Sequence, residues 1–309
     1  MEKKGFYTQS AGGADASHRT PRDAATVILL RECAEGPYEL FLMRRGRNQA
    51  FMGGAYVFPG GSLDEADADP DLAARPGGLR ADDAKRLLQE PDLTDAAACG
   101  LFVAAIRETF EEAGVLLARD SVGNTVDLSA PETAARFAGY RTELHENRMT
   151  LLEMARREGL CFAPDLLVPY SHWITPPIET RRFDTRFFLA GLPPGQAPIH
   201  DRMELTDSRW LTPALALAEH AAGRIVLMPP TLKTVEELLD FSGIDRLMAA
   251  ARSRPIPAIR PEAFWTAGGF GIILPHDSEY ALPGPKPEPR PTGSTRIVME
   301  NGIWKTRTV

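Results

Sequence analysis

Hydrophobic runs near the start of the chain predict a β-hairpin. Residues 24–31 (AATVILLR) and 38–45 (YELFLMRR) are rich in β-branched and aromatic residues, and a short loop containing a Gly-Pro pair separates them. A third run, residues 55–58 (AYVF), stops at Pro59-Gly60-Gly61. Proline lacks the N–H that pairs with a neighbouring strand, and glycine adopts backbone conformations closed to other residues. A strand that ends in a tight loop is therefore expected at this point.

A long helix is predicted after these strands. It begins near Thr94, a residue type that caps helix N-termini, and ends at Gly114, which is typical of the position after the last helical residue. The pattern downstream predicts two helices, three strands and two more helices, at residues 131–145, 148–158, 166–175, 183–190, 208–211, 212–223 and 229–241. This order of strands and helices predicts a mixed α/β domain.

Three segments depart from this pattern. Residues 62–92 are acidic and interrupted by proline and glycine, so we expect an exposed excursion with one short helix at about 82–89. Nine prolines between Pro255 and Pro291 disfavour long regular elements, and Asn301-Gly302 predicts a hairpin near the C-terminus. We therefore expect a mobile tail (1–22), a main domain (23–242, with an insertion at about 68–93) and a proline-rich extension (243–309).

Composition and charge restrict the classes of partner. The chain has 309 residues, of which 43% are hydrophobic and 25% are charged, as is ordinary for globular proteins. Its net charge of −7 matches a polyanion poorly, so nucleic acid is not expected as a partner. No apolar run approaches the roughly 20 residues of a membrane span, and the first thirty residues lack a signal-peptide core. We expect a cytoplasmic protein that acts on a small molecule, and nothing in the sequence indicates its oligomeric state.

Three carboxylates lie on one face of the predicted long helix. Glu108, Glu111 and Glu112 have the spacing i, i+3 and i+4, at which helical side chains are neighbours. Like charges at these positions repel each other, which a solvated acidic face would tolerate but would not explain. A hard divalent cation such as Mg²⁺ or Mn²⁺ would explain them, because it takes carboxylate oxygens and works together with substrate phosphates.

The sequence around these glutamates resembles the Nudix box of hydrolases that act on nucleoside diphosphate derivatives. In that family the box reads G, five residues, E, seven residues, R-E-U-x-E-E-x-G-U, where U is a bulky apolar residue. The second half is matched by Arg107, Glu108, Glu111, Glu112, Gly114 and Val115. Thr109 stands at a U position, Asp67 stands where the first Glu is expected, and about 32 extra residues separate the two halves.

Other segments are similar to the coenzyme A branch of the Nudix family. Residues 58–67 (FPGGSLDEAD) resemble its F-P-G-G-x-x-D-x-x-D pattern. Together with residues 181–185 (RRFDT), the split box resembles the subgroup of the mammalian peroxisomal coenzyme A diphosphatase and its bacterial relatives. The resemblance covers about residues 24–242. It implies an α/β/α Nudix sandwich with a mixed sheet, and metal-dependent hydrolysis of coenzyme A or acyl-CoA to 3′,5′-ADP and (acyl-)4′-phosphopantetheine.

The resemblance also implies roles for the catalytic residues. Glu108, Glu111 and Glu112 would hold Mg²⁺ or Mn²⁺, one of them also positioning or deprotonating water, and Arg107 would orient them through a charge-assisted bond. Family members often add a carboxylate from a later loop. Glu204 is the candidate for that carboxylate, with Asp201 as the second choice and an ordinary exposed acid as the alternative.

Glycines and arginines are the candidates for substrate binding. Gly60 and Gly61 would let the backbone turn tightly before the helix. Contacts to substrate phosphates are expected from arginines at strand ends, unless these are ordinary basic residues flanking strands: Arg44, Arg45, Arg181 and Arg182. Two other functions stay open, a Nudix hydrolase of another substrate such as ADP-ribose or NADH, and a catalytically weak nucleotide-sensing module.

Overall fold

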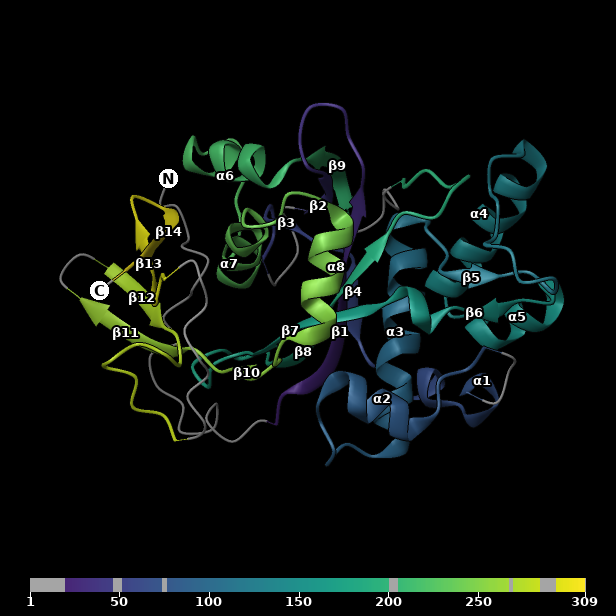
Figure 1. The fold of residues 1–309 in the computed structure, drawn as a ribbon, viewed down its shortest axis with the longest axis horizontal. Helices are drawn as coiled ribbons and strands as arrows, with labels where there is room; N and C mark the ends of the chain where they lie inside the picture. The colour runs from purple at the N-terminus through teal and green to yellow at the C-terminus, as the bar shows by residue number, and fades with distance from the viewer. Residues whose placement is uncertain are drawn as a thin grey trace.

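The computed structural model describes residues 20–46, 52–73, 77–199, 205–266, 269–283 and 293–308. At its centre lies a mixed sheet in the order β10-β7-β8-β1-β2-β3, with β4 paired to β1 and β9 paired to β2 (Figure 1). Its strands are β1 (Arg22–Arg31), β2 (Glu39–Arg45), β3 (Tyr56–Val57), β4 (Gly60–Ser62), β7 (Val168–Ile174), β8 (Phe183–Gly191), β9 (Leu205–Leu211) and β10 (Ala258–Ile259). Of the expected tail, residues 1–19 lie outside the described residues, and Arg22 begins β1.

Strand β1 organises the sheet. It pairs antiparallel with β2 from Leu30 opposite Leu40, which confirms the predicted hairpin. It pairs parallel with β8 from Arg22 to Leu30. On its other edge, Thr26 lies opposite Gly60 in an antiparallel pairing with β4. The Pro59-Gly60-Gly61 segment, which we name the glycine loop, is therefore fixed against the first half of β1, and its two glycines belong to β4 rather than to the tight turn that the sequence predicted.

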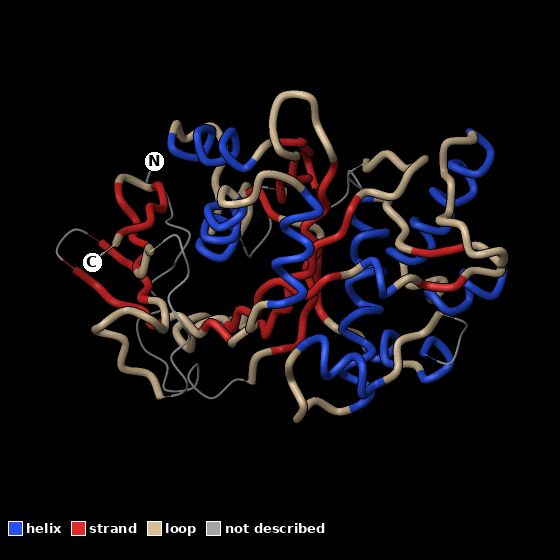
Figure 2. The backbone as a smooth tube through the Cα atoms, in the orientation of Figure 1, coloured by secondary structure: helices blue, strands red, loops and turns tan. Residues whose placement is uncertain are grey.

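Helices cover both faces of this sheet, because alternate side chains of β1 enter two separate hydrophobic cores. Val27 and Leu29 pack into one core, and Ile28 and Leu30 into the other. The first core holds α1 (Pro70–Ala73), α2 (Ala81–Leu88), α3 (Asp95–Ala113), α4 (Pro131–His145) and α5 (Leu151–Glu158). The second holds α6 (Pro213–Ala221), α7 (Pro229–Leu238) and α8 (Ile244–Ser253). This arrangement, visible in Figure 2, confirms the α/β/α sandwich.

The long helix α3 has the predicted ends. The side chain of Thr94 accepts a hydrogen bond from the backbone N–H of Ala97, and Gly114 ends the helix with a left-handed φ of 69°. Beyond it, a short ribbon of β5 (Ala118–Arg119) and β6 (Cys161–Phe162) joins the helical layer. Helices α4 and α5 confirm the two helices predicted between 131 and 158, the second starting at Leu151.

The insertion is more integrated than the sequence suggested. It contains a short 3₁₀ helix (Glu65–Ala68), α1 and α2, and α2 corresponds to the helix expected at 82–89. The expectation of an exposed excursion is wrong, because Leu72, Ala84 and Leu88 are buried in the same core as α3. The apolar positions of these short helices are too few to produce a clear periodic pattern, so their burial was not visible in the sequence.

The C-terminal region forms a second sheet. Four antiparallel strands follow the order β11 (Glu262–Thr266), β12 (Gly269–Ile273), β13 (Arg296–Glu300) and β14 (Ile303–Arg307). The hairpin predicted at Asn301-Gly302 is confirmed, with both residues at positive φ. The prolines lie outside these strands, so their number concealed β11 and β12 in the sequence. Helix α8, which ends before Pro255, was not predicted either. Ile272, Ile297 and Trp304 join this sheet to the core of α6, α7 and α8. Within the described ranges, every helix is too short or too polar to cross a membrane.

Candidate active site

The glycine loop and helix α3 meet in the first part of the site. The backbone N–H of Gly60 donates to Oε2 of Glu112 at 2.9 Å. A Cβ atom on Gly60 would collide with the backbone oxygen of Ala25, and one on Gly61 would collide with the carboxylate of Glu108. A side chain on Gly60 would push β4 away from β1, and one on Gly61 would displace the carboxylate of Glu108. The Gly60-Gly61 pair therefore sets the distance between the loop and the glutamates.

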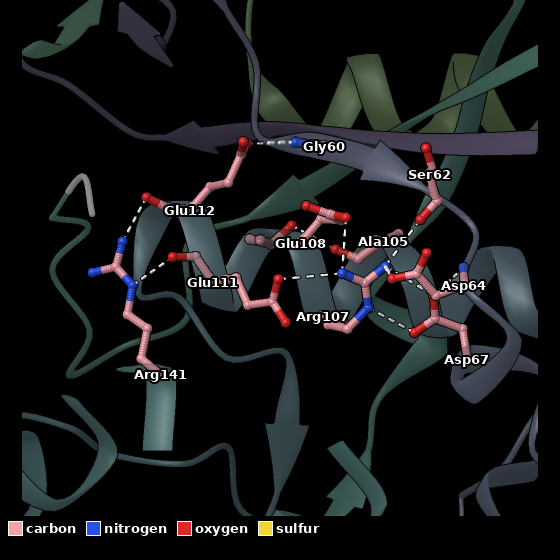
Figure 3. A network of polar contacts seen from close by, with 11 residues as sticks. Gly60, Ser62, Asp64, Asp67, Ala105, Arg107, Glu108, Glu111, Glu112 and Arg141 are labelled. Carbon is pink, nitrogen blue, oxygen red and sulfur yellow. Dashed lines mark hydrogen bonds and ion pairs between the residues drawn. The ribbon is translucent and has the colours of Figure 1, made fainter. Parts of the chain in front are cut away.

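Arg107 links the glycine loop, the insertion and the glutamates (Figure 3). Its Nε and one terminal nitrogen donate to the two carboxylate oxygens of the buried Asp67, at 2.8 and 2.9 Å. Its other terminal nitrogen donates to Glu108 at 2.8 Å and to Glu111 at 3.2 Å. Burial opposes the charge of Arg107, but the bond to Asp67 and the charges of Glu108 and Glu111 outweigh it and raise its pKa. The guanidinium is thus held in one orientation by carboxylates on two sides.

Glu108 and Glu111 of α3 are largely buried, so their carboxyl groups have little contact with water. Burial raises the pKa of Glu108 to about 7, against the attraction of Arg107 and with added repulsion from Glu111. Burial also raises the pKa of Glu111, again against Arg107. A positive charge placed among these oxygens would offset the penalty that burial imposes on their ionised forms.

The donor set fits a hard divalent cation in its chemistry, since Glu108, Glu111 and Glu112 offer carboxylate oxygens that border one cavity. A ready-made cluster is absent: among the described residues, no three Asp, Glu, His or Cys side chains are already grouped to hold a metal ion. The oxygens bond to protein donors instead, those of Glu108 and Glu111 to Arg107 and that of Glu112 to Gly60. Binding of a cation would therefore replace some of these hydrogen bonds with bonds from the carboxylate oxygens to the metal.

Arg141 of helix α4 is a residue that the sequence did not single out. Its Nε donates to the backbone oxygen of Glu111 and a terminal nitrogen donates to that of Glu112, both at 2.6 Å. These carbonyls belong to the last turn of α3, where no helical N–H is available to them. Arg141 thus fixes the helix end that carries both glutamates. An arginine within a predicted helix gives no sequence signal for such a contact.

A cavity of about 780 Å³ opens beside the glutamates. Its other walls are largely apolar. They come from β7, β8, the start of α7 and the region of the C-terminal sheet: Trp173, Phe183, Phe187, Met228, Pro229, Pro230, Pro261 and Ile272. His145, at the end of α4, and Glu179, between β7 and β8, also border it. No local pattern in the sequence marks either residue, because only the tertiary fold brings them to the cavity.

The arginines expected at the phosphates divide into two pairs. Arg45 and Arg181 line the cavity. Arg44 and Arg182 are not among its lining residues: Nε of Arg44 donates to Oγ1 of Thr206, and Nε of Arg182 donates to the backbone oxygen of Thr175. The expected later carboxylate, Glu204, and its second choice, Asp201, lie outside the described residues. Neighbours in sequence thus have different surroundings, Arg44 and Arg45 at the end of β2 and Arg181 and Arg182 just before β8.

Comparison with known proteins agrees with this architecture. A family model described as the NUDT19 Nudix domain matches residues 21–238. The acyl-coenzyme A diphosphatase NUDT19 of Gallus gallus is 30% identical over 326 residues, covering 90% of this chain and 83% of the relative. The protein of the same name from Homo sapiens is 32% identical, covering 80% of this chain and 73% of the relative.

A solved structure shows the same fold. The crystal structure of a Nudix hydrolase from Alicyclobacillus acidocaldarius matches with a TM-score of 0.61 and 27% identity, covering 75% of this chain and 97% of that one. The family match spans well over half of the chain and contains the glycine loop, the insertion and α3. The chain therefore belongs to the Nudix hydrolase family, in its NUDT19-like, coenzyme A diphosphatase-like branch, and is a Nudix pyrophosphohydrolase.

Proposed function

We propose that this enzyme hydrolyses the diphosphate linkage of coenzyme A or acyl-CoA, releasing 3′,5′-ADP and 4′-phosphopantetheine or its acylated form. The observation that carries the proposal is the cavity of about 780 Å³, which combines the three glutamates of α3, the side chains of Arg45 and Arg181, and a largely apolar wall. Coenzyme A needs these three environments, because it combines a diphosphate, a further phosphate and a long arm. The names of the curated relatives support the same substrate class.

The residues of α3 would carry the metal-dependent step. We propose that Glu108, Glu111 and Glu112 hold Mg²⁺ or Mn²⁺, the divalent metals that Nudix hydrolases generally use. When bound, such a metal neutralises charge on the diphosphate and activates water. Arg107 keeps Glu108 and Glu111 in position, and Asp67 in turn keeps Arg107 in position through two hydrogen bonds.

Positive side chains on the cavity wall would bind the remaining phosphates. Of the four arginines considered, we retain Arg45 and Arg181 for this role because they border the cavity. Guanidinium groups match phosphate oxygens in shape and charge, so they favour a substrate with an additional phosphate over one without it. The additional phosphate is the group that coenzyme A has and that ADP-ribose and NADH lack.

The apolar wall would accept the pantetheine arm and an acyl chain. Helix α7 begins at the wall with Pro229 and Pro230, which have no backbone N–H. This helix end therefore offers fewer donors to a phosphate than an ordinary helix N-terminus, and it presents ring carbons instead. Pro261 and Ile272 extend the same wall. We therefore propose that the catalytic domain is residues 23–242 and that residues 243–309 complete its substrate cavity.

A substrate screen tests the proposal. Coenzyme A, an acyl-CoA, ADP-ribose and NADH are incubated separately with the enzyme, with Mg²⁺ or Mn²⁺ and with a chelator. The proposal expects the highest kcat/KM for coenzyme A or acyl-CoA, and no turnover in the chelator. Faster hydrolysis of ADP-ribose or NADH would favour the alternative Nudix substrate, and no turnover of any compound with metal present would favour a sensing module.

A further inference from the structure

Two residues that line the cavity each carry an enclosed polar atom with no protein partner among the described residues. They belong to one supersecondary unit, strand β7, the loop at 175–182 and strand β8, which we name the β7–β8 hairpin. Oε1 of Glu179, in the loop, is enclosed and has no hydrogen-bond partner among the described residues. The same holds for Nε1 of Trp173, near the end of β7. Such groups are costly to bury unless a ligand or water completes them.

The carboxyl of Glu179 differs from those of α3. Glu108 and Glu111 bond to Arg107. Glu179, by contrast, takes part in no ion pair with the described residues, and burial alone raises its pKa to about 7. A structural glutamate is ordinarily paired with a cation or with backbone donors. Glu179 therefore has the properties of a group whose partner arrives with the substrate.

We propose that the β7–β8 hairpin recognises polar groups of the substrate, with Glu179 bonding a hydrogen-bond donor and the indole N–H of Trp173 bonding an acceptor. The indole can only donate, and a carboxylate can only accept, so the ligand must offer both functions. This proposal rests on the proposed function. Coenzyme A offers the pair in two places, in the secondary amides of the pantetheine arm and on the edge of adenine, where the 6-amino group adjoins ring nitrogens.

Two variants of Glu179 separate hydrogen bonding from shape. Glu179→Leu removes both oxygens, whereas Glu179→Gln keeps an acceptor in the same place. We expect Glu179→Leu to raise KM for coenzyme A about tenfold with little change in kcat, the size expected when one hydrogen bond is lost. Glu179→Gln should stay within about twofold of the wild type. The melting temperature of Glu179→Leu should be unchanged or higher, because an unpaired buried carboxyl is replaced by an apolar group.

Trp173→Phe tests the second atom, since it keeps an aromatic ring and removes the N–H. Its matched control is Trp304→Phe, which changes an equally buried tryptophan outside the cavity lining. The control for Glu179 is Glu132→Gln, at an exposed position in α4. Trp173→Phe should weaken substrate binding several-fold, and neither control should change it.

The two halves of coenzyme A identify the group that is recognised. Calorimetric titration of wild type and variants with 3′,5′-ADP or with 4′-phosphopantetheine measures each half separately. Weaker binding of 3′,5′-ADP alone assigns the subsite to adenine, and weaker binding of 4′-phosphopantetheine alone assigns it to an amide. The proposal is overturned if Glu179→Leu and Trp173→Phe bind both halves as tightly as the wild type. It is also overturned if Glu179→Gln loses as much as Glu179→Leu, since charge rather than hydrogen bonding would then matter.

The same titration keeps this proposal separate from the proposed function. If the wild type binds the halves but does not hydrolyse coenzyme A, the proposed function fails, and the variants still decide the role of the hairpin. If the wild type hydrolyses coenzyme A but binds neither half, the proposed function stands, and an unchanged KM for coenzyme A in Glu179→Leu and Trp173→Phe would overturn the role of the hairpin.

Discussion

The two sides of the cavity are built in opposite ways. On the α3 side, charged groups are bonded to one another: Asp67 to Arg107, Arg107 to two glutamates, and Glu112 to Gly60. On the far side, the surfaces from the β7–β8 hairpin, α7 and β12 are mostly apolar, and two of their polar atoms have no partner among the described residues. The first side is organised before substrate arrives, and the second depends on what substrate brings. We therefore attribute the chemistry to the first side and the choice of substrate to the second.

The largest expected effect follows from changing the glutamates. Glu111→Gln and Glu112→Gln each keep the size of the side chain and an oxygen that can accept the existing hydrogen bonds. Activity should fall by about 100-fold or more, as expected when a metal ligand or water-activating group is lost. The melting temperature should stay the same or rise, because each change removes one negative charge from a group of neighbouring glutamates that repel one another. Near-normal turnover of both variants at saturating metal would remove α3 from the chemistry.

A smaller effect is expected from the residue that supports Arg107. Asp67→Asn replaces a bidentate ion pair with a single hydrogen bond from the buried guanidinium of Arg107 to an uncharged amide oxygen. The free energy of unfolding should fall by about 2 kcal/mol, and kcat should fall roughly tenfold, since Arg107 would hold Glu108 and Glu111 less firmly. Urea denaturation and steady-state kinetics measure the two losses. A loss of stability with unchanged kcat would show that Asp67 stabilises the fold but does not contribute to catalysis.

The two arginines that line the cavity, Arg45 and Arg181, should decide between related substrates. Coenzyme A carries a 3′-phosphate that 3′-dephospho-CoA lacks, so we expect kcat/KM for the dephospho form to be lower by about tenfold. Arg45→Ala or Arg181→Ala should abolish this preference while keeping activity on 3′-dephospho-CoA. Arg44→Ala is the matched control, because its side chain bonds to Thr206 and does not line the cavity. Loss of the preference in the control and its retention in both cavity variants would reverse the assignment.

The smallest effect on catalysis is expected in the insertion, where neighbouring leucines provide a matched pair. Leu88 is 2% exposed and packs with α3, whereas Leu87 is 36% exposed. Leu88→Ala should cost about 2–3 kcal/mol of unfolding free energy, and Leu87→Ala under about 1 kcal/mol. Both variants should keep the wild-type kcat. Equal stability of the two would mean that the insertion is not part of the core.

The contrast between the two sides also explains how far the sequence could be interpreted. Helix α3 has both ends marked, by Thr94 and Gly114, and its glutamates have a fixed spacing, so a local pattern was sufficient to locate them. The central sheet followed from strands with clear hydrophobic runs. The apolar wall is different, because residues as distant as Trp173, Met228 and Ile272 meet only after the chain folds.

Local rules also failed where short elements depend on tertiary contacts. Helix α8 and strands β11 and β12 lie close to prolines, whose number suggested irregular structure, yet the prolines occupy the connections. Arg44 and Arg45 looked equivalent in sequence, but the sheet separates their surroundings. Arg141 carries no signal at all, since its partners are backbone carbonyls of another helix.

The measurement that tests the central claim most directly is product analysis by mass spectrometry after incubation of the enzyme with coenzyme A. With Mg²⁺ or Mn²⁺ present, the account predicts 3′,5′-ADP and 4′-phosphopantetheine in equal amounts. It predicts neither product in the presence of a chelator, and about 100-fold less of both from Glu111→Gln. Intact coenzyme A after incubation with metal, under conditions in which ADP-ribose is cleaved, would contradict the account.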